Sequence, residues 1–222
     1  MLVLEQPISK REKILQAALE LIQEQGLNEL TTAKIARRSG TAETIIYRHF
    51  SGKQEILTEL LQRVGNDFQK SAEAIFDENI SPPEKLTKLS ASHLSFIHQT
   101  KGISRILFSE QIHLAKADDP LKIAARVIAA EYRNCVKQII CDGKASGHFA
   151  EDLDAETASL SFMGLHYLLM HEWSLDSFSW DLPAMNTTIS DYYINAWQPK
   201  QTWQSIDITK QRKGCDCSEM VP

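Results

Sequence analysis

Residues 26–57 read GLNELTTAKIARRSGTAETIIYRHFSGKQEIL. Apolar residues at helical spacing predict one short helix over Thr32–Arg38 and a second over Ala42–Phe50, joined by the turn Ser39-Gly40-Thr41. A longer helix over Lys10–Gln25 precedes them. Two short helices across a tight turn that contains glycine, braced by a first helix, have the spacing of a helix-turn-helix.

Outside this stretch, helical periodicity continues almost throughout, and the alternating runs typical of strands are hard to find. We therefore expect an all-α protein, with an N-terminal three-helix helix-turn-helix domain over residues 8–65 and a larger helical bundle over 66–198. The further helices are expected at about 53–78, 84–99, 103–116, 121–145, 155–174 and 182–197. Polar residues dominate 199–222, which predicts a disordered tail.

Three serines predict where helices begin. Ser9, Ser51 and Ser81 each stand three residues before Glu or Gln, which is the pattern of a capping box. Gly26 and Gly40 follow helical runs, as glycines that end helices do. These positions give the N-terminal helices clear expected boundaries.

The charge is distributed unevenly along the chain. The 222 residues carry a formal net charge of -5. Residues 1–65 hold nine basic and eight acidic side chains, which leaves 15 basic and 21 acidic ones for residues 66–222. Five cations gather within twenty residues of the N-terminal part, so only this part is suited to a polyanion. They are Lys34, Arg37, Arg38, Arg48 and Lys53.

Several classes of protein are not indicated. No run approaches the length of a membrane helix and no export leader opens the chain, so we expect a soluble protein of the reducing cytoplasm, at the nucleoid. The sequence holds no P-loop, GxSxG or HExxH, and we do not expect an enzyme or a cofactor. Its histidines lack helical metal-ligand spacing, so no metal site is expected. Cys215 and Cys217 could chelate, act as a redox switch or be inert.

The segment 26–57 resembles the DNA-binding domain of the TetR family of transcriptional regulators. The matching features are Gly26, Leu30-Thr31-Thr32, Ile35-Ala36, Gly40, Ile46-Tyr47-Arg48-His49-Phe50, Lys53 and Glu55-Ile56-Leu57. Burial of Ile35, Ala36, Ile46 and Phe50 would brace the second short helix for entry into the major groove. The resemblance implies DNA contacts by Thr44 and Tyr47 and phosphate contacts by Thr32 and His49. The complete set of DNA-binding candidates is Thr32, Lys34, Arg37, Glu43, Thr44, Tyr47, Arg48, His49 and Lys53.

Two positions depart from the family pattern. Ala42 stands where the family often has a capping serine, and Glu43 stands where a non-acidic residue is common. An acid repels phosphate but can accept a hydrogen bond from the N4 amine of cytosine. Glu43 therefore bears on which DNA sequence is read.

The resemblance also implies dimerisation through the last two helices and a ligand cavity among the middle ones. The dimer candidates are Ser161, Gly164, Leu165, Leu168, Ile189, Tyr193 and Trp197, and the two helices carry more apolar surface than one core face needs. The cavity candidates are His93, Phe96, Phe108, Ile112, His113, Tyr132, His166, Tyr167, Met170 and Trp173. As a set, these side chains are also typical of plain core packing.

The expected function follows from this resemblance. We expect a homodimeric repressor that binds a palindromic double-stranded DNA operator and is released by an unidentified small-molecule effector. In the alternative, the DNA-bound dimer uses its acidic helical body as a platform for another protein, with no effector. A closed, mostly apolar cavity favours the first reading, and a solid bundle with an exposed apolar patch favours the second.

Overall fold

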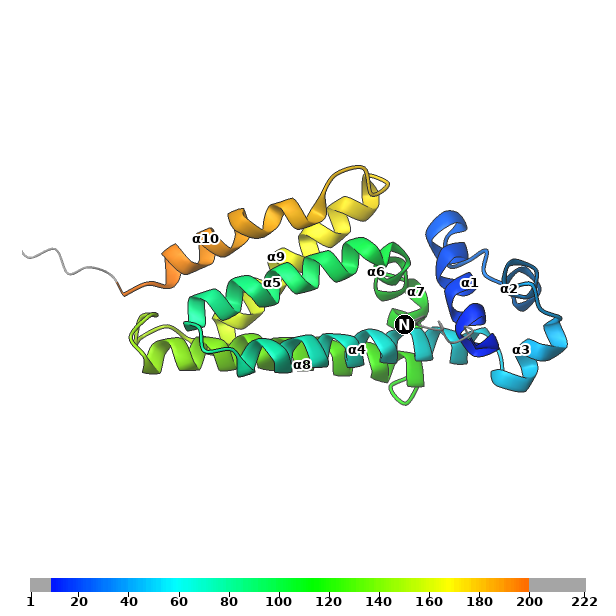
Figure 1. Ribbon diagram of the computed structural model, residues 1–222, viewed down its shortest axis with the longest axis horizontal. Helices are drawn as coiled ribbons and strands as arrows, with labels where there is room; N and C mark the ends of the chain where they lie inside the picture. The colour runs from blue at the N-terminus through cyan, green and yellow to red at the C-terminus, as the bar shows by residue number, and fades with distance from the viewer. Residues whose placement is uncertain (1–8, 200–222) are drawn as a thin grey trace, which may run out of the picture.

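The computed structural model describes residues 9–199, which form α-helices and one short 3-10 helix, η1, without a strand among them. A small unit at one end comprises α1 (Lys10–Gln25), α2 (Thr32–Ser39) and α3 (Glu43–His49), as Figure 1 shows. The long helix α4 (Lys53–Asp77) leads from this unit into an elongated bundle. The bundle continues with α5 (Pro82–Gln99), α6 (Lys101–Leu107), α7 (Glu110–Leu114), α8 (Pro120–Ala145), α9 (Ala155–Leu175), η1 (Leu182–Met185) and α10 (Asn186–Trp197).

The all-α architecture, with an N-terminal helix-turn-helix and a larger bundle, is confirmed. Two expected helices differ in detail. The helix expected over 103–116 is two helices, because the backbone of Ser109 is extended (ψ 145°) and its hydroxyl donates to the carbonyl of Ile106 at 2.7 Å. The last helix begins at Asn186 rather than 182, because Leu182–Met185 form a 3-10 turn that contains Pro183.

The predicted caps are correct at two serines and wrong at the third. The hydroxyl of Ser9 accepts from the amide of Glu12 at 3.1 Å, and the carboxylate of Glu84 accepts from the amide of Ser81 at 2.8 Å. Ser51 does not cap α4, which has Gly52 at its N-cap position without a side-chain cap. The amide of Ser51 instead donates to the carboxylate of Glu55, at 2.6 Å. Its side-chain partner is therefore Glu55 and not the expected Gln54, one residue earlier.

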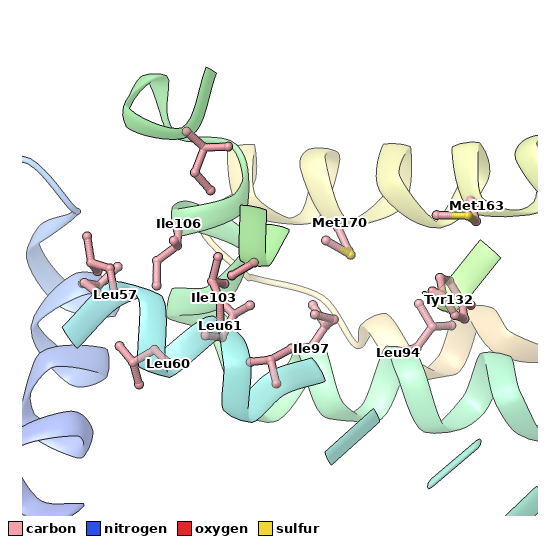
Figure 2. Close-up of a cluster of buried hydrophobic side chains, with 14 of the residues drawn as sticks. Leu57, Leu60, Leu61, Leu94, Ile97, Ile103, Ile106, Tyr132, Met163 and Met170 are labelled. Atoms are coloured by element: carbon pink, nitrogen blue, oxygen red, sulfur yellow. The ribbon is translucent and has the colours of Figure 1, made fainter. Parts of the chain in front are cut away.

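The two parts of the molecule touch through α1 and α6, beside the start of α4. Figure 2 shows Leu57, Leu60 and Leu61 of α4 next to Ile103 and Ile106 of α6. Gly102 lets α6 approach α1 closely, since a methyl group there would lie 2.8 Å from Cδ1 and 2.9 Å from the carbonyl oxygen of Leu19. The bundle therefore packs directly against α1, the helix that supports α2 and α3.

Some expectations concern residues outside 9–199. The predicted tail, from residue 200 onward, and the Cys215 and Cys217 pair lie outside the described residues. Across residues 9–199, the helices are all too short or too polar to cross a membrane.

Candidate DNA interface and effector cavity

The second and third helices are held as a rigid pair. Thr31 caps α2 by accepting from the amide of Lys34 at 3.2 Å, and Gly40 ends α2 in the left-handed region, at φ 65°. Ile46 on the inner side of α3 is fully buried, and Phe50, directly after the helix, is 2% exposed. Tyr47 is 55% exposed, so it is a surface side chain and not a core aromatic.

Three of the DNA-binding candidates contact one another across the helix-turn-helix. The Thr32 hydroxyl donates to the Glu43 carboxylate at 2.5 Å and lies 3.3 Å from the Tyr47 hydroxyl. These side chains come from the first turn of α2 and from successive turns of α3. They form one polar surface, beside the exposed side chains of Thr44 and Arg48.

The cations of this region fall into two groups. Arg38 is paired with Glu24 at 2.6 Å, and Lys34 with Glu29 at 2.7 Å, so both turn toward α1 and the loop after it. The hydrogen bond from Arg38 lowers the pKa of Glu24. Within residues 9–199, Arg37, Arg48 and Lys53 form no ion pair.

His49 contributes through its backbone. Its carbonyl accepts a hydrogen bond from the Arg11 guanidinium at 2.8 Å, and this guanidinium lies 4.3 Å from the centre of the Phe50 ring and is also bonded to Glu59 of α4. Arg11 thereby ties α1, the end of α3 and α4 together. The orientation of α3 is consequently fixed to the long helix that enters the bundle.

A narrow cavity of about 50 Å³ lies between α4, α5, α8 and α9. Its surface is mostly apolar. Five of the ten candidates line it, namely His93, Phe96, Tyr132, Tyr167 and Met170. Sequence reasoning missed the side that α4 contributes, because that helix was assigned to the connection between domains. The α4 lining residues are Val64, Asp67, Phe68 and Ser71.

The other five cavity candidates lie elsewhere. Trp173 is fully buried, and its indole donates to the carbonyl of Trp180 at 2.7 Å. Phe108 faces an open groove near α7, and His113 is exposed. Ile112 is buried in the core, and His166 is buried beside the cavity, outside its lining. The predicted stripe of His166, Met170 and Trp173 is therefore mainly core.

The dimer candidates divide between surface and core. Gly164 and Ser161 are exposed, Leu168 is 54% exposed, and a methyl group on Gly164 would meet no atom of residues 9–199 within 4 Å. Leu165 is half-buried. Dimerisation through α10 stays a prediction, but three of its candidates belong to the core of the protomer, because they pack inward against α9 and its neighbours. These are Ile189, Tyr193 and Trp197, at 2%, 7% and 6% exposed.

Comparison with known protein families accounts for both halves of this arrangement. The model described as bacterial regulatory proteins of the tetR family matches residues 14–60, and the model of the C-terminal region of YsiA-like proteins matches residues 60–196, more than half of the chain. The chain belongs to the TetR family. It is a DNA-binding transcriptional regulator, and α2 and α3 are the helix-turn-helix of this TetR-family protein.

Three similar proteins illustrate the relationship. The chain is 26% identical over 186 residues to the fatty acid metabolism regulator protein of Bacillus subtilis, which covers 84% of this chain and 94% of that protein. It is 29% identical over 151 residues to the transcriptional repressor KstR2 of Mycolicibacterium smegmatis, covering 68% and 73%. The fold matches the crystal structure of FadR from Bacillus subtilis in complex with stearoyl-CoA, with a TM-score of 0.69 and 24% identity over 82% of this chain and 96% of that one.

Proposed function

We propose that this TetR-family dimer is a repressor whose hold on a palindromic operator is weakened when a fatty acyl thioester enters the cavity between α4, α5, α8 and α9. The observation that carries this proposal is the position of the cavity. It is lined by α4, the same helix that begins directly beside α3. We take residues 8–65 as the DNA-binding unit and 66–198 as the unit that binds effector and dimerises, acting at the nucleoid in the cytoplasm.

The choice of ligand class has two supports. The lining is dominated by Phe68, Phe96, Ile97, Leu107 and Met170, which suit a hydrocarbon chain. The family match over residues 60–196 includes all the cavity helices, and the relatives include a fatty acid metabolism regulator and a regulator solved with stearoyl-CoA.

The size of the cavity explains how a ligand would act. About 50 Å³ is room for a few water molecules, whereas pockets for drug-sized ligands measure about 300–1,000 Å³. An acyl chain therefore has to move the surrounding helices apart. A ligand that fits only the expanded bundle shifts the population toward that state by its differential affinity for the two states.

Direct contacts connect the expanding bundle with the DNA-binding unit. The close approach at Gly102 sets α6 on Leu19 of α1. At the start of α4, the Gln54 amide lies 3.3 Å from both carboxylate oxygens of Asp119, the residue that caps α8. Movement of α4 or α6 is thereby passed to α1, and through Arg11 to α3.

Release of DNA also requires a dimer whose two α3 helices are spaced to fit the operator. On α9 the exposed residues Leu160, Gly164 and Leu168 follow one another at four-residue spacing and form one stripe. A two-fold axis through this stripe would pair two α3 helices, which then read half-sites about 34 Å apart. A change in that separation lowers affinity for the operator without any ligand touching DNA.

Release of DNA by a defined thioester tests the proposal. A specific DNA would first be selected from a random pool with the purified full chain and verified by gel shift. Palmitoyl-CoA is expected to dissociate this complex, whereas coenzyme A alone, which lacks the chain, leaves it intact. A complex that persists at saturating palmitoyl-CoA overturns the effector class.

A further inference from the structure

Two polar atoms of residues that line the effector cavity have no hydrogen-bond partner within residues 9–199. They are Nδ1 of His93, on α5, and the hydroxyl of Tyr132, on α8. Both atoms are fully buried, and Tyr132 as a whole is only 3% exposed. Both residues line the cavity. An unsatisfied buried donor or acceptor destabilises the folded state, so such a pair calls for an explanation.

The two rings are held next to each other by aromatic packing. Their centroids lie 4.3 Å apart, with an interplanar angle of 67°, and Phe68 of α4 packs edge-on against Tyr132 at 4.9 Å. This cluster joins three of the cavity helices. The polar atoms are therefore placed by rigid elements and cannot turn away to solvent without breaking the packing.

A neighbouring histidine, His166, shows that a ring in this cluster can find hydrogen-bond partners within the protein. His166 lies 5.6 Å from His93, ring centre to ring centre, and both of its ring nitrogens are bonded. Its Nδ1 is 2.8 Å from the carbonyl of Phe162, and its Nε2 is 2.8 Å from the Ser90 hydroxyl. His166 is a satisfied core residue, whereas His93 and Tyr132, which line the cavity, each keep a polar atom without a hydrogen-bond partner within residues 9–199.

We propose that His93 and Tyr132 together bind one neutral oxygen, a hydroxyl or a carbonyl, on the otherwise apolar effector. Such an oxygen satisfies both groups, because the Tyr132 hydroxyl can donate to it while His93 Nδ1 accepts from a hydroxyl or, in its other tautomer, donates to a carbonyl. This inference rests on the proposed function, since it assumes that a ligand enters this cavity, and it adds the chemistry that the cavity selects.

The same geometry rejects a free carboxylate. Among residues 9–199, no lysine or arginine lines the cavity, and Asp67 does line it. Burial holds His93 neutral by lowering its pKa to about 3, with His166 acting in the same direction. A carboxylate would thus lose its hydration without gaining a counter-charge, which is far more costly than burial of an ester or an alcohol.

Probes with the same chain length isolate the polar contact. We would measure the affinity of the full-length dimer for 1-dodecanol, methyl dodecanoate and dodecanoate at pH 7.5, for the wild type and Tyr132→Phe. The cost of opening the cavity is common to the three probes and cancels in the comparison. The alcohol and the ester are expected to bind at least tenfold more tightly than the carboxylate, and Tyr132→Phe is expected to lose about tenfold of that affinity.

The stability of the unliganded protein gives an independent readout. Tyr132→Phe is expected to melt no lower than the wild type, because it removes an unpaired hydroxyl. Tyr193→Phe, the matched control, removes a hydroxyl that donates to the Ser161 carbonyl at 2.7 Å and is expected to melt lower.

Different results would refute the neutral-oxygen site and the effector cavity. Probes that bind wild type and Tyr132→Phe equally, a carboxylate that binds as well as the alcohol, or a lower melting temperature for unliganded Tyr132→Phe would each overturn the neutral-oxygen site while leaving an apolar effector cavity possible. If none of the probes binds the wild type and palmitoyl-CoA also fails to release DNA, the effector cavity itself is refuted.

Discussion

The hydroxyl of Thr32 donates a 2.5 Å hydrogen bond to the carboxylate of Glu43, joining the first turn of α2 to the first residue of α3. Thr32 is a phosphate-facing candidate and Glu43 a candidate for reading a base. In the free protein the hydroxyl of Thr32 and the carboxylate of Glu43 are hydrogen-bonded to each other. Binding to DNA must therefore exchange this bond for contacts with phosphate and base, and the exchange makes Glu43 a determinant of sequence preference.

Replacing Glu43 by Gln tests this role. The amide keeps an acceptor for Thr32 but removes a negative charge that repels phosphate. We expect tighter binding to DNA of any sequence and a loss of preference for cytosine at one position in each half-site, worth about 1–3 kcal/mol. Sequencing the DNA that each protein enriches from a random pool measures the preference. Identical enriched sequences would remove Glu43 from base recognition.

The surroundings of two lysines predict different effects on DNA binding. Lys53 has no ion pair within residues 9–199 and lies in the first turn of α4, where a cation and helix amides suit phosphate. Lys53→Ala should weaken binding to all DNA alike and reduce the slope of log K against log salt by about one per protomer. Lys34 already contacts Glu29 and Gln25, so Lys34→Ala should do less. Salt titrations of both variants on one DNA provide the comparison, and an equal change in slope would contradict it.

The contact between α6 and α1 can be tested at one glycine. Gly102→Ala places a methyl group 2.8 Å from Leu19 Cδ1 and 2.9 Å from the Leu19 carbonyl oxygen. The carbonyl belongs to the backbone of α1 and cannot easily move away. We expect a destabilisation of about 1–3 kcal/mol, or roughly 2–10 °C in Tm, together with a weaker response of DNA binding to effector. Gly65→Ala is the control, because the three nearest atoms to its methyl group belong to side chains rather than backbone, those of Ile128 at 3.0 Å and Glu131 at 3.9 Å. Equal melting of the two variants would show that the α1 contact is not tight.

The exposed stripe of α9 predicts a specific loss of dimer. A methyl group at Gly164 would meet no atom of residues 9–199 within 4 Å, so the fold of Gly164→Leu should persist while a partner helix is kept away. Sedimentation velocity is expected to show a monomer. Asn134→Leu, an equally apolar change at an exposed position of α8, should leave the dimer intact. A dimeric Gly164→Leu protein would exclude this stripe from the interface.

Two histidines of the bundle, the half-buried His93 and the buried His166, predict a loss of stability in mild acid. Burial lowers the pKa of His93 to about 3 and that of His166 to about 4. Both lie below the ordinary value near 6.5, so the unfolded chain takes up protons first, and the stabilisation present above pH 6.5 is lost as the pH falls toward 4.

Urea unfolding at several pH values measures this effect. Between pH 7 and pH 5 each histidine should remove about 2 kcal/mol from the free energy of unfolding. His93→Phe has no imidazole at this position, so it should not lose the part of the free energy of unfolding that protonation of His93 removes. The free energy of unfolding of this variant should therefore fall less steeply with decreasing pH. A slope equal to that of the wild type would mean that His93 is protonated in the folded state.

Local sequence patterns predicted what is local in this structure. The cap of α1 at Ser9, the turn at Gly40 and the exposed face of α3 follow from neighbouring residues, and so did the choice between Tyr47 at the surface and Phe50 in the core. The break at Ser109 did not, because the apolar rhythm runs through it and a single serine decides the backbone.

The cavity and the dimer face were harder to predict because they depend on packing between distant helices. Val64 and Phe68 line the cavity only because α4 lies against α8, some sixty residues away. Tyr193 looked available for a partner, but its hydroxyl is bonded within the protomer to the Ser161 carbonyl. Periodicity identifies an apolar face without showing whether that face meets its own chain or another.

We predict that effector binding in the cavity and DNA binding at the helix-turn-helix are thermodynamically coupled. Measuring the affinity for each ligand with and without the other tests this coupling. By linkage, the factor by which saturating palmitoyl-CoA weakens binding to the selected DNA must equal the factor by which that DNA weakens binding of palmitoyl-CoA. We expect the same factor in both directions, of about tenfold or more. Unchanged affinities in both titrations would contradict the coupling.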